Sequence, residues 1–195
     1  MWPLLLISII NLACIFERII FWFDLGNKKD KIPKLILENY CISNNEFIQF
    51  LYQKKRNPYT EILIDIFNSN FVKEKDFEKA LDINLVSQNN KLNKYGNFFN
   101  LTIGIAPLLG LLGTVLGLMN SFSFIDLGNV GANSREVTGG ISEALVSTAY
   151  GLIIAIFTLV FLSYFNIRRK NEIIFLSDFV NRFKILYFNN LSKTN

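Results

Sequence analysis

Two apolar segments near the C-terminal end, APLLGLLGTVLGLMNSF (Ala106 to Phe122) and GGISEALVSTAYGLIIAIFTLVFLSYF (Gly139 to Phe165), decide the fold of this chain. Each is long enough, with its flanks, to cross a hydrocarbon core of about 30 Å as a helix. Both carry small and hydroxyl residues at spacings of three and four, which places these residues on one helical face. In lipid, such a stripe lets helix backbones approach closely.

The two stripes have the same character. On the first segment the stripe consists of Ala106, Gly110, Gly113, Thr114 and Gly117, and on the second it consists of Gly140, Ala144, Ser147, Thr148, Gly151 and Ala155. We therefore expect two membrane helices that make close backbone contacts. Glu143, an ionisable residue, lies within the first turns of the second segment.

The composition points to a membrane protein and away from several other classes. Apolar residues make up 51% of the 195 residues, with 19 Phe, so a membrane protein is the first class to test. The net charge is +4, but the basic residues do not gather into a patch interleaved with aromatics, which argues against nucleic-acid binding. The chain has no His and only Cys14 and Cys41, so neither a zinc site nor a disulfide framework is expected.

No enzyme motif or cofactor site is apparent in the sequence. There is no glycine-rich phosphate loop, no nucleophile with an accompanying base and no set of metal ligands. We therefore expect an integral membrane subunit that is not an enzyme and that binds no cofactor and no metal.

The N-terminal segment predicts a further membrane helix over residues 1–23. WPLLLISIINLACIFERIIFWF (Trp2 to Phe23) is apolar apart from Asn11 and the pair Glu17 and Arg18. A secretory signal peptide is the alternative, but no basic region precedes the apolar run and no small-residue cleavage site follows it. Arg18 is expected to extend toward the lipid headgroups at the inner end of the helix.

Residues 24–97 are polar and charged, which indicates a region outside the membrane. Apolar residues at helical spacing predict short helices over Ile32 to Asn39, Glu46 to Gln53 and Tyr59 to Phe67, punctuated by Pro33 and Pro58. No helix breaker separates Lys75 from Asn97, so we expect one long helix that runs directly into the second span, residues 98–120. The result would be a helical stalk with no separate globular domain.

The remaining segments and the basic residues predict the topology. Residues 121–138 form a loop of Gly, Asn and Ser, residues 139–165 form the third span, and residues 166–195 form an amphipathic helical tail. The apolar face of this tail is expected to consist of Ile173, Ile174, Phe179, Val180, Phe183 and Leu186. Basic residues cluster at the same-side ends of all three spans: Lys28, Lys29, Lys31, Lys34, Lys91, Lys94, Arg168, Arg169 and Lys170. By the positive-inside rule that side is cytoplasmic, so the N-terminus and the 121–138 loop lie outside.

These motifs resemble the ExbB/TolQ/MotA family of proton-channel subunits, most closely its ExbB branch. The resemblance rests on APLLGLLGTVLGLM followed after a short loop by GGISEALVSTAYGL, and on the opening span WPLLLIS…FERIIFW. It covers the order, approximate lengths and N-out orientation of all three spans. It implies an all-α integral membrane protein of the bacterial inner membrane whose three helices are extended by a cytoplasmic stalk.

The resemblance also implies an assembly and a mechanism. Family members form a ring, a homopentamer, whose second and third helices surround a dimer of an ExbD-like single-span protein. Protons pass through an Asp on that partner, and the ring drives a TonB-like effector that spans the periplasm. By motif position, Thr114 and Thr148 correspond to the pore-lining threonines, Glu143 to the intramembrane glutamate and Pro107 to the proline of the second helix.

Each of these residues has a plainer interpretation. Thr114 and Thr148 can bond back to their own helices, and Glu143 can be a structural partner for a neighbouring subunit or lie close enough to the outer interface to be solvated. Pro107 can simply kink its helix. Ordinary tight packing accounts for most of what the small residues do, namely Gly110, Gly113, Gly117, Ala144 and Gly151.

One departure and two alternatives qualify the interpretation. In the third span the family has a proline where this chain has Phe157, so we expect a straighter helix there. The leading function is an ExbB-like subunit that couples the proton-motive force to TonB-dependent transport. The alternatives are a TolQ-like subunit for envelope maintenance and a non-conducting membrane scaffold.

Overall fold

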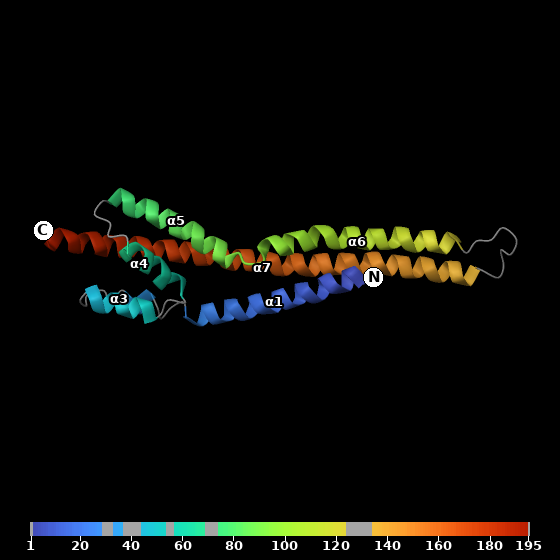
Figure 1. Ribbon diagram of the computed structural model, residues 1–195, viewed down its shortest axis with the longest axis horizontal. Coiled ribbons are helices and arrows are strands. Elements are labelled where there is room, and N and C mark those ends of the chain that lie inside the picture. The colour runs from blue at the N-terminus through green and yellow to red at the C-terminus, as the bar shows by residue number, and fades with distance from the viewer. Residues whose placement is uncertain are drawn as a thin grey trace. The chain divides into compact units, whose positions relative to one another are not determined.

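The computed structural model describes residues 2–28, 33–36, 44–53, 57–68, 74–123 and 134–194, and nearly all of them are helical. The helices are α1 (Trp2–Lys28), α3 (Asn44–Gln53), α4 (Pro58–Asn68), α5 (Glu74–Leu92), α6 (Gly96–Ser123) and α7 (Ser134–Thr194), as Figure 1 shows. A further helical turn covers residues 33–36. The expected all-α fold class is confirmed, whereas most of the expected 121–138 loop lies outside the described residues.

Among the residues that the structure describes, three helices are long and apolar enough to cross a membrane. The qualifying segments are Trp2–Gly26, Gly96–Ser123 and a stretch within Thr138–Asn189, with mean hydropathies of 2.2, 2.1 and 2.4. Each overlaps one of the spans expected from the sequence.

The described helices form two compact units. The first contains residues 1–18 and 95–165, and the second contains residues 19–94 and 166–195. Helices α1 and α7 each contribute one end to each unit, while α6 belongs wholly to the first.

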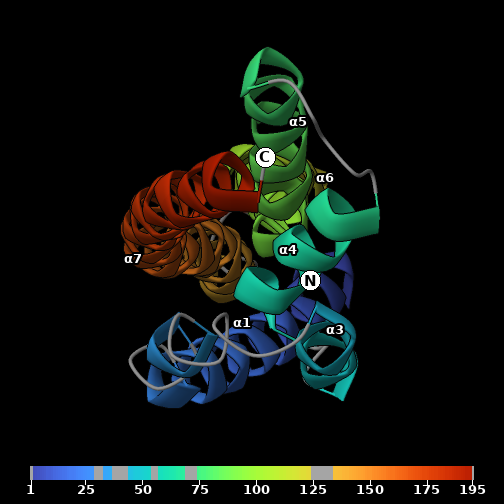
Figure 2. The same ribbon diagram turned by 90° about the vertical axis from the view of Figure 1, so that its left-hand side faces the viewer.

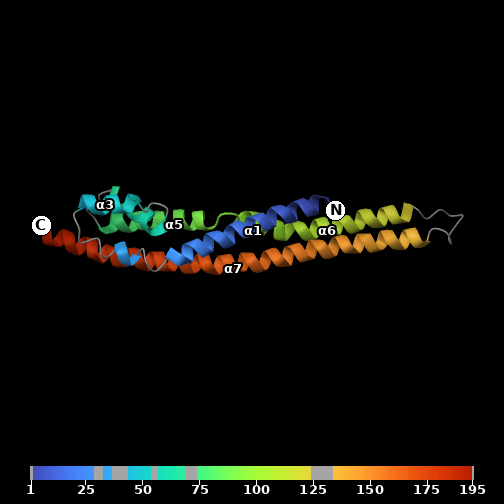
Figure 3. The ribbon, with the colours of Figure 1, turned by 90° about the horizontal axis from the view of Figure 1, so that it is seen from below.

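The first unit is built on α6 lying along the first part of α7. Figure 1 and Figure 3 both show the two helices side by side. Their buried positions recur at spacings of three and four: Phe99, Thr102, Ala106 and Gly110 on α6, and Ala144, Ser147, Gly151, Ala155, Thr158, Leu162 and Phe165 on α7. Because most of these side chains are small, the two backbones approach closely.

The second unit has a hydrophobic core of its own, which corrects the expectation of a stalk without a globular domain. Figure 2 shows α3, α4 and α5 gathered beside the C-terminal part of α7. The core contains Ile36, Phe47, Leu51, Tyr59, Ile62, Leu63, Ile64, Ile66, Phe77, Leu81, Leu176, Phe179, Val180 and Phe183. The short helices are amphipathic, and each buries its apolar face against the others or against α7.

The start of α4 illustrates how sequence fixes these short helices. The side-chain Oδ1 of Asn57 accepts a hydrogen bond from the backbone N–H of Tyr59 at 3.0 Å, and Thr60 donates its hydroxyl to the Asn57 carbonyl at 2.9 Å. Asn57 is therefore the N-cap, and Pro58 occupies the first helical position, where its missing N–H costs nothing. Glu61 in the first turn complements the helix dipole.

Helices α5 and α6 are separate, so the expectation of one continuous helix is wrong. α5 ends at Leu92, and a turn at residues 93–95 precedes α6. Tyr95 has a φ of 66°, a left-handed conformation that terminates a helix and that non-glycine residues seldom adopt. The carbonyl of Tyr95 then accepts the N–H of Phe99 at 2.9 Å, which starts the hydrogen-bond ladder of α6.

The third expected span and the expected tail are one helix. α7 runs for 61 residues as α-helix, through Phe157 and on to Thr194. The expected apolar face of the tail is only partly correct. Phe179, Val180 and Phe183 are in the core of the second unit, whereas Ile174 and Leu186 are 56% and 40% exposed.

Candidate functional site

The closest approach of α6 to α7 is centred on Gly110 and Gly151. A Cβ on Gly151 would lie 2.5 Å from the carbonyl oxygen of Ala106 and 3.1 Å from the Cα of Gly110. A Cβ on Gly110 would lie 3.0 Å from the Thr148 Cα. Because these neighbours are backbone atoms, a side chain at either position could be accommodated only by separating the helices.

The contact continues toward the other end of α6 through small side chains. A Cβ on Gly113 would lie 2.8 Å from the Cβ of Ser147, and one on Gly117 would lie 2.7 Å from the Cβ of Ala144. Gly140 faces the hydroxyl of Ser121. The two stripes recognised in the sequence therefore lie against each other within one chain.

Thr148 joins the two helices by a hydrogen bond. Its hydroxyl donates to the backbone carbonyl of Gly110 at 3.0 Å. Thr114 instead donates to the carbonyl of Leu111 on its own helix, at 2.7 Å. Both residues are half-buried. A bond back to the residue's own helix, the plainer interpretation of these threonines, describes Thr114 but not Thr148.

Glu143 lies on the flank of the same contact. The residue is exposed, whereas its backbone carbonyl accepts the Ser147 hydroxyl at 3.4 Å. At 100° per residue, Glu143 and Thr148 are about 140° apart around α7, with the α6 contact between them. One chain therefore presents the carboxyl and the threonine hydroxyl on opposite sides of the helix pair.

Pro107 lies inside α6 without ending it. Proline has no N–H, so the carbonyl four residues earlier, at Ile103, loses its usual helical donor. Pro107 adjoins Ala106, whose carbonyl is the backbone atom nearest to Gly151. The proline and the tightest part of the helix contact thus occupy the same turn of α6.

A polar contact that no sequence motif predicts joins α1 to α7. Asn11 donates its Nδ2 to the hydroxyl oxygen of Thr158 at 2.8 Å, and Thr158 donates in turn to the Ile154 carbonyl at 2.6 Å. Asn11 is 2% exposed and Thr158 is fully buried. The Oδ1 of Asn11 is also buried and has no hydrogen-bond partner among the described residues. The signal was a lone amide in an apolar helix, but its partner is 147 positions away.

Removing the Thr158 hydroxyl is expected to destabilise the protein more than removing the Asn11 amide. Thr158→Val leaves both ends of a buried amide unpaired, which costs about 1–3 kcal/mol. Asn11→Leu removes the amide altogether and leaves a hydroxyl already bonded to its own helix. We therefore expect the double variant to be more stable than Thr158→Val alone, as measured by thermal unfolding in mild detergent.

A matched control uses Thr102, which is equally buried but donates to the Phe98 carbonyl of its own helix at 3.0 Å. Thr102→Val combined with Asn11→Leu should give the sum of the two single effects. If Thr158→Val and Asn11→Leu are also additive, the interhelical bond does not contribute to stability.

Arg18 does not extend toward solvent, which corrects the expectation for this residue. It is 2% exposed, and its charge interacts with Glu17 and with Tyr95, the left-handed residue before α6. The buried guanidinium of Arg18 therefore lies close enough to Tyr95, the residue before α6, to interact with it electrostatically. Within the described ranges, no group of three or more His, Cys, Asp or Glu side chains could hold a metal ion.

Comparison with known proteins finds a protein family whose model matches this chain. The family model described as the MotA/TolQ/ExbB proton channel family matches residues 49–177. That range covers α4, α5, α6 and the part of α7 that carries Glu143 and Thr148.

Individual relatives extend the match over most of the chain. A putative biopolymer transport protein ExbB-like 3 from Synechocystis is 34% identical over 95% of this chain and 89% of its own length. A putative biopolymer transport protein ExbB-like 1 from the same organism is 30% identical over 82% of this chain and 63% of its own length. The biopolymer transport protein ExbB of Salmonella typhimurium is 50% identical over 62 residues, a quarter of its length.

Proposed function

Because the chain belongs to the MotA/TolQ/ExbB proton channel family, we propose that it is an ExbB-like subunit of a proton-driven motor. In this proposal the chain works with an ExbD-like single-span partner and couples the proton-motive force to TonB-dependent transport across the outer membrane. The observation that carries the proposal is the tight α6–α7 pair, with Thr148 bonded across it and Glu143 on its flank.

The exposure of Glu143 supports a ring of several copies. An ionised carboxylate in the hydrocarbon core costs roughly 2.5–3.5 kcal/mol or more, so contact with lipid is unfavourable for this side chain. Glu143 is five residues, about 7.5 Å, from the start of the apolar segment at Thr138. A water-filled pore or a neighbouring subunit satisfies the carboxylate at that depth, and a homopentameric ring supplies both.

We propose that Thr114 and Thr148 line the pore and offer their hydroxyl oxygens as hydrogen-bond acceptors. A hydroxyl has one donor and two acceptor sites. Thr114 and Thr148 each use the donor on a backbone carbonyl, so each can still accept a hydrogen bond. We propose that they accept from water or from a protonated Asp of the single-span partner.

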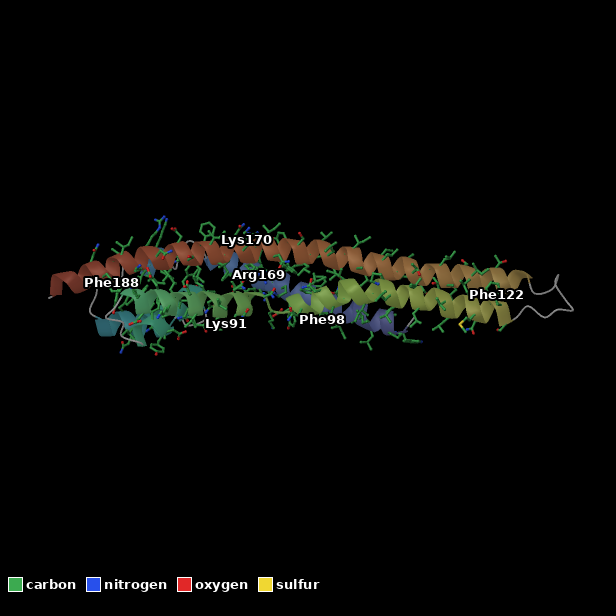
Figure 4. All side chains as sticks on the ribbon, turned by 90° about the horizontal axis from the view of Figure 1, so that it is seen from above. Lys91, Phe98, Phe122, Arg169, Lys170 and Phe188 are labelled. Carbon is green, nitrogen blue, oxygen red and sulfur yellow. The ribbon has the colours of Figure 1, made fainter. Side chains whose placement is uncertain are left out.

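The positions of the basic residues support an orientation in the bacterial inner membrane. Lys91 and Lys94 precede α6, and Arg168, Arg169 and Lys170 follow the apolar part of α7. Figure 4 shows Lys91, Arg169 and Lys170 at one level along the long axis. By the positive-inside rule this level marks the cytoplasmic side, so we propose that the second unit is cytoplasmic and the N-terminus periplasmic.

A non-conducting scaffold is the second candidate, and the bonds made by the two threonines favour it. Both hydroxyls donate to helix backbone, which is sufficient reason for a buried threonine in a purely structural helix pair. A TolQ-like role in envelope maintenance uses the same ring with a different effector. Identifying the effector that co-purifies separates the ExbB-like role from the TolQ-like role.

Native mass spectrometry of the gently solubilised chain, co-expressed with a single-span protein encoded beside it, tests the proposed function. We expect a homopentamer that carries two copies of a partner whose membrane span contains an Asp. A stable monomer or dimer without a partner, with the helical content unchanged by circular dichroism, would leave the scaffold as the better account.

A further inference from the structure

Tyr150 places a phenol hydroxyl in the apolar part of α7. The residue is 55% exposed, and its hydroxyl makes no hydrogen bond within the part of the chain that the structure describes. Tyrosine in a membrane helix is typically found at the membrane surface, where its hydroxyl reaches water. The depth of Tyr150 therefore decides whether this hydroxyl needs another partner.

Tyr150 lies near the middle of the membrane-crossing part of the helix pair. Residues 101–119 of α6 carry no charge and extend over about 28 Å, close to the hydrocarbon thickness of about 30 Å. The central residue of this range, Gly110, contacts α7 at Thr148 and Gly151, on either side of Tyr150. A tyrosine side chain is shorter than half of the hydrocarbon core, so its hydroxyl does not reach the membrane surface from this position.

Glu143 and Tyr150 lie on the same face of α7. Seven residues of an α-helix turn through about 700°, so the two positions are only about 20° apart around the helix and about 10 Å apart along it. Both lie about 80–100° from Gly151, on one flank of the contact with α6. Side chains on a helix lean toward its N-terminus, so the phenol of Tyr150 leans toward Glu143.

Two phenylalanines occupy this face beyond Tyr150. Phe157 and Phe161 follow Tyr150 by seven and eleven residues, and each lies within about 20° of it around the helix. Their aromatic rings are 4.8 Å apart and carry no hydroxyl or carboxyl group. The face is therefore able to form hydrogen bonds from Glu143 to Tyr150, and it is apolar from Phe157 onward.

We propose that Tyr150 is a further proton-path residue, a role that rests on the proposed function. Its hydroxyl binds water that enters beside Glu143 and extends to the middle of the membrane. Lipid tails offer no hydrogen bond at this depth, and an unpaired hydroxyl there is unfavourable. Water and a phenol can each both donate and accept a hydrogen bond.

The transfer leaves the tyrosine unchanged. The hydroxyl oxygen of Tyr150 accepts a proton from a hydronium ion on the Glu143 side, and the hydroxyl releases its own proton to an acceptor beyond it. In the proposed complex that acceptor is the Asp carboxylate of the single-span partner. Phe157 and Phe161 prevent the water from continuing along α7 past Tyr150.

Proton flux through a complex that carries Tyr150→Phe tests this role. The substitution keeps the aromatic ring and removes only the hydroxyl, so a packing role predicts no change. We expect flux, measured as acidification of vesicles that contain the complex, to fall at least about fivefold, which corresponds to about 1 kcal/mol on the transport barrier. Tyr164→Phe is the matched control, because Tyr164 is an exposed tyrosine of α7 beyond the two phenylalanines, and it should leave flux unchanged.

Cysteine labelling tests whether water reaches this position. Tyr150→Cys and Ile153→Cys are compared in full-length chains that also carry Cys14→Ala and Cys41→Ser, co-expressed with the single-span partner. Ile153 is 60% exposed but lies about 200° from Gly151, on the side of α7 away from α6. A charged thiol reagent, added from the proposed periplasmic side, should modify Tyr150→Cys much faster than Ile153→Cys.

The unsubstituted complex separates failure of this role from failure of the proposed function. If that complex forms the homopentameric ring and conducts protons, full flux in Tyr150→Phe overturns the role of the hydroxyl and leaves the proposed function standing. The same holds if Tyr150→Cys in an intact ring is modified no faster than Ile153→Cys, or if Tyr164→Phe lowers flux as much as Tyr150→Phe. An unsubstituted chain that forms no ring and conducts no protons overturns both proposals.

Discussion

Replacing Gly151 by alanine is expected to destabilise the chain by about 1–3 kcal/mol, the usual cost of inserting a methyl group into a filled contact. The new Cβ would lie 2.5 Å from the Ala106 carbonyl oxygen and 3.1 Å from the Gly110 Cα. Both atoms belong to the backbone of α6, so relief requires the whole helix to move. Gly110 and Thr148 would then separate, and the 3.0 Å hydrogen bond between them would lengthen.

The sign of the change in stability distinguishes an effect on packing from an effect on helix propensity. In an unhindered helix, alanine is more favourable than glycine by about 1 kcal/mol. Gly104 and Gly139 are also helical, and a Cβ at either would meet nothing within 4 Å. Gly104→Ala and Gly139→Ala should therefore be neutral or stabilising in thermal unfolding, whereas Gly151→Ala lowers the melting temperature. A Gly151→Ala variant that is as stable as these two would show that α6 and α7 do not pack as described.

The helix contact was predictable because it depends on local spacing. Glycines and small residues repeat every three or four positions on both segments, and each stripe is visible within one stretch of sequence. The three apolar helices follow from length and hydropathy in the same way. The sequence did not specify that the two stripes meet within one chain, which the structure shows through pairs such as Gly117 with Ala144.

Features that depend on contacts distant in sequence were missed or wrong. The α5–α6 break rests on Tyr95 in a left-handed conformation, which tyrosine rarely adopts without support from its surroundings. The core of the second unit joins Tyr59 to Glu172, whose carboxylate accepts the tyrosine hydroxyl at 2.8 Å. These residues are 113 positions apart, and neither local periodicity nor charge pattern pairs them.

The residues of the candidate site were predictable from the sequence, whereas their hydrogen bonds were not. Motif position identified Thr114, Thr148 and Glu143, but the bonds that they make depend on how the two helices are rotated about their axes. Thr148 reaches across to Gly110, whereas Thr114 bonds to its own helix. The sequence left a pore-lining role and a bond to the residue's own helix open for each threonine, and it did not predict the bond from Thr148 across to α6.

Replacing Glu143 by glutamine is expected to lower proton flux through the assembled complex at least about tenfold, which corresponds to about 1.4 kcal/mol on the transport barrier. Glutamine matches the size of glutamate but cannot ionise or carry a proton. The side chain is exposed on the flank of the α6 contact, so the substitution removes a charge without disturbing packing. Flux is measured as acidification of vesicles that contain the complex, and native mass spectrometry verifies that the ring is intact.

Glu78→Gln supplies the matched control for loss of a carboxylate. Glu78 is an exposed acid in the second unit whose 2.7 Å salt bridge to Lys184 belongs to a class of surface pairs that contributes about 0–1 kcal/mol. Its replacement should leave flux unchanged, and Glu143→Asp, which keeps the charge on a shorter side chain, should retain part of it. An intact Glu143→Gln ring with full flux would instead show that proton transport does not require the carboxylate. If Glu143→Gln loses the ring and Glu143→Asp keeps it, the carboxylate stabilises the contact with a neighbouring subunit. Only the ionised form can pair with a charge on the adjacent copy.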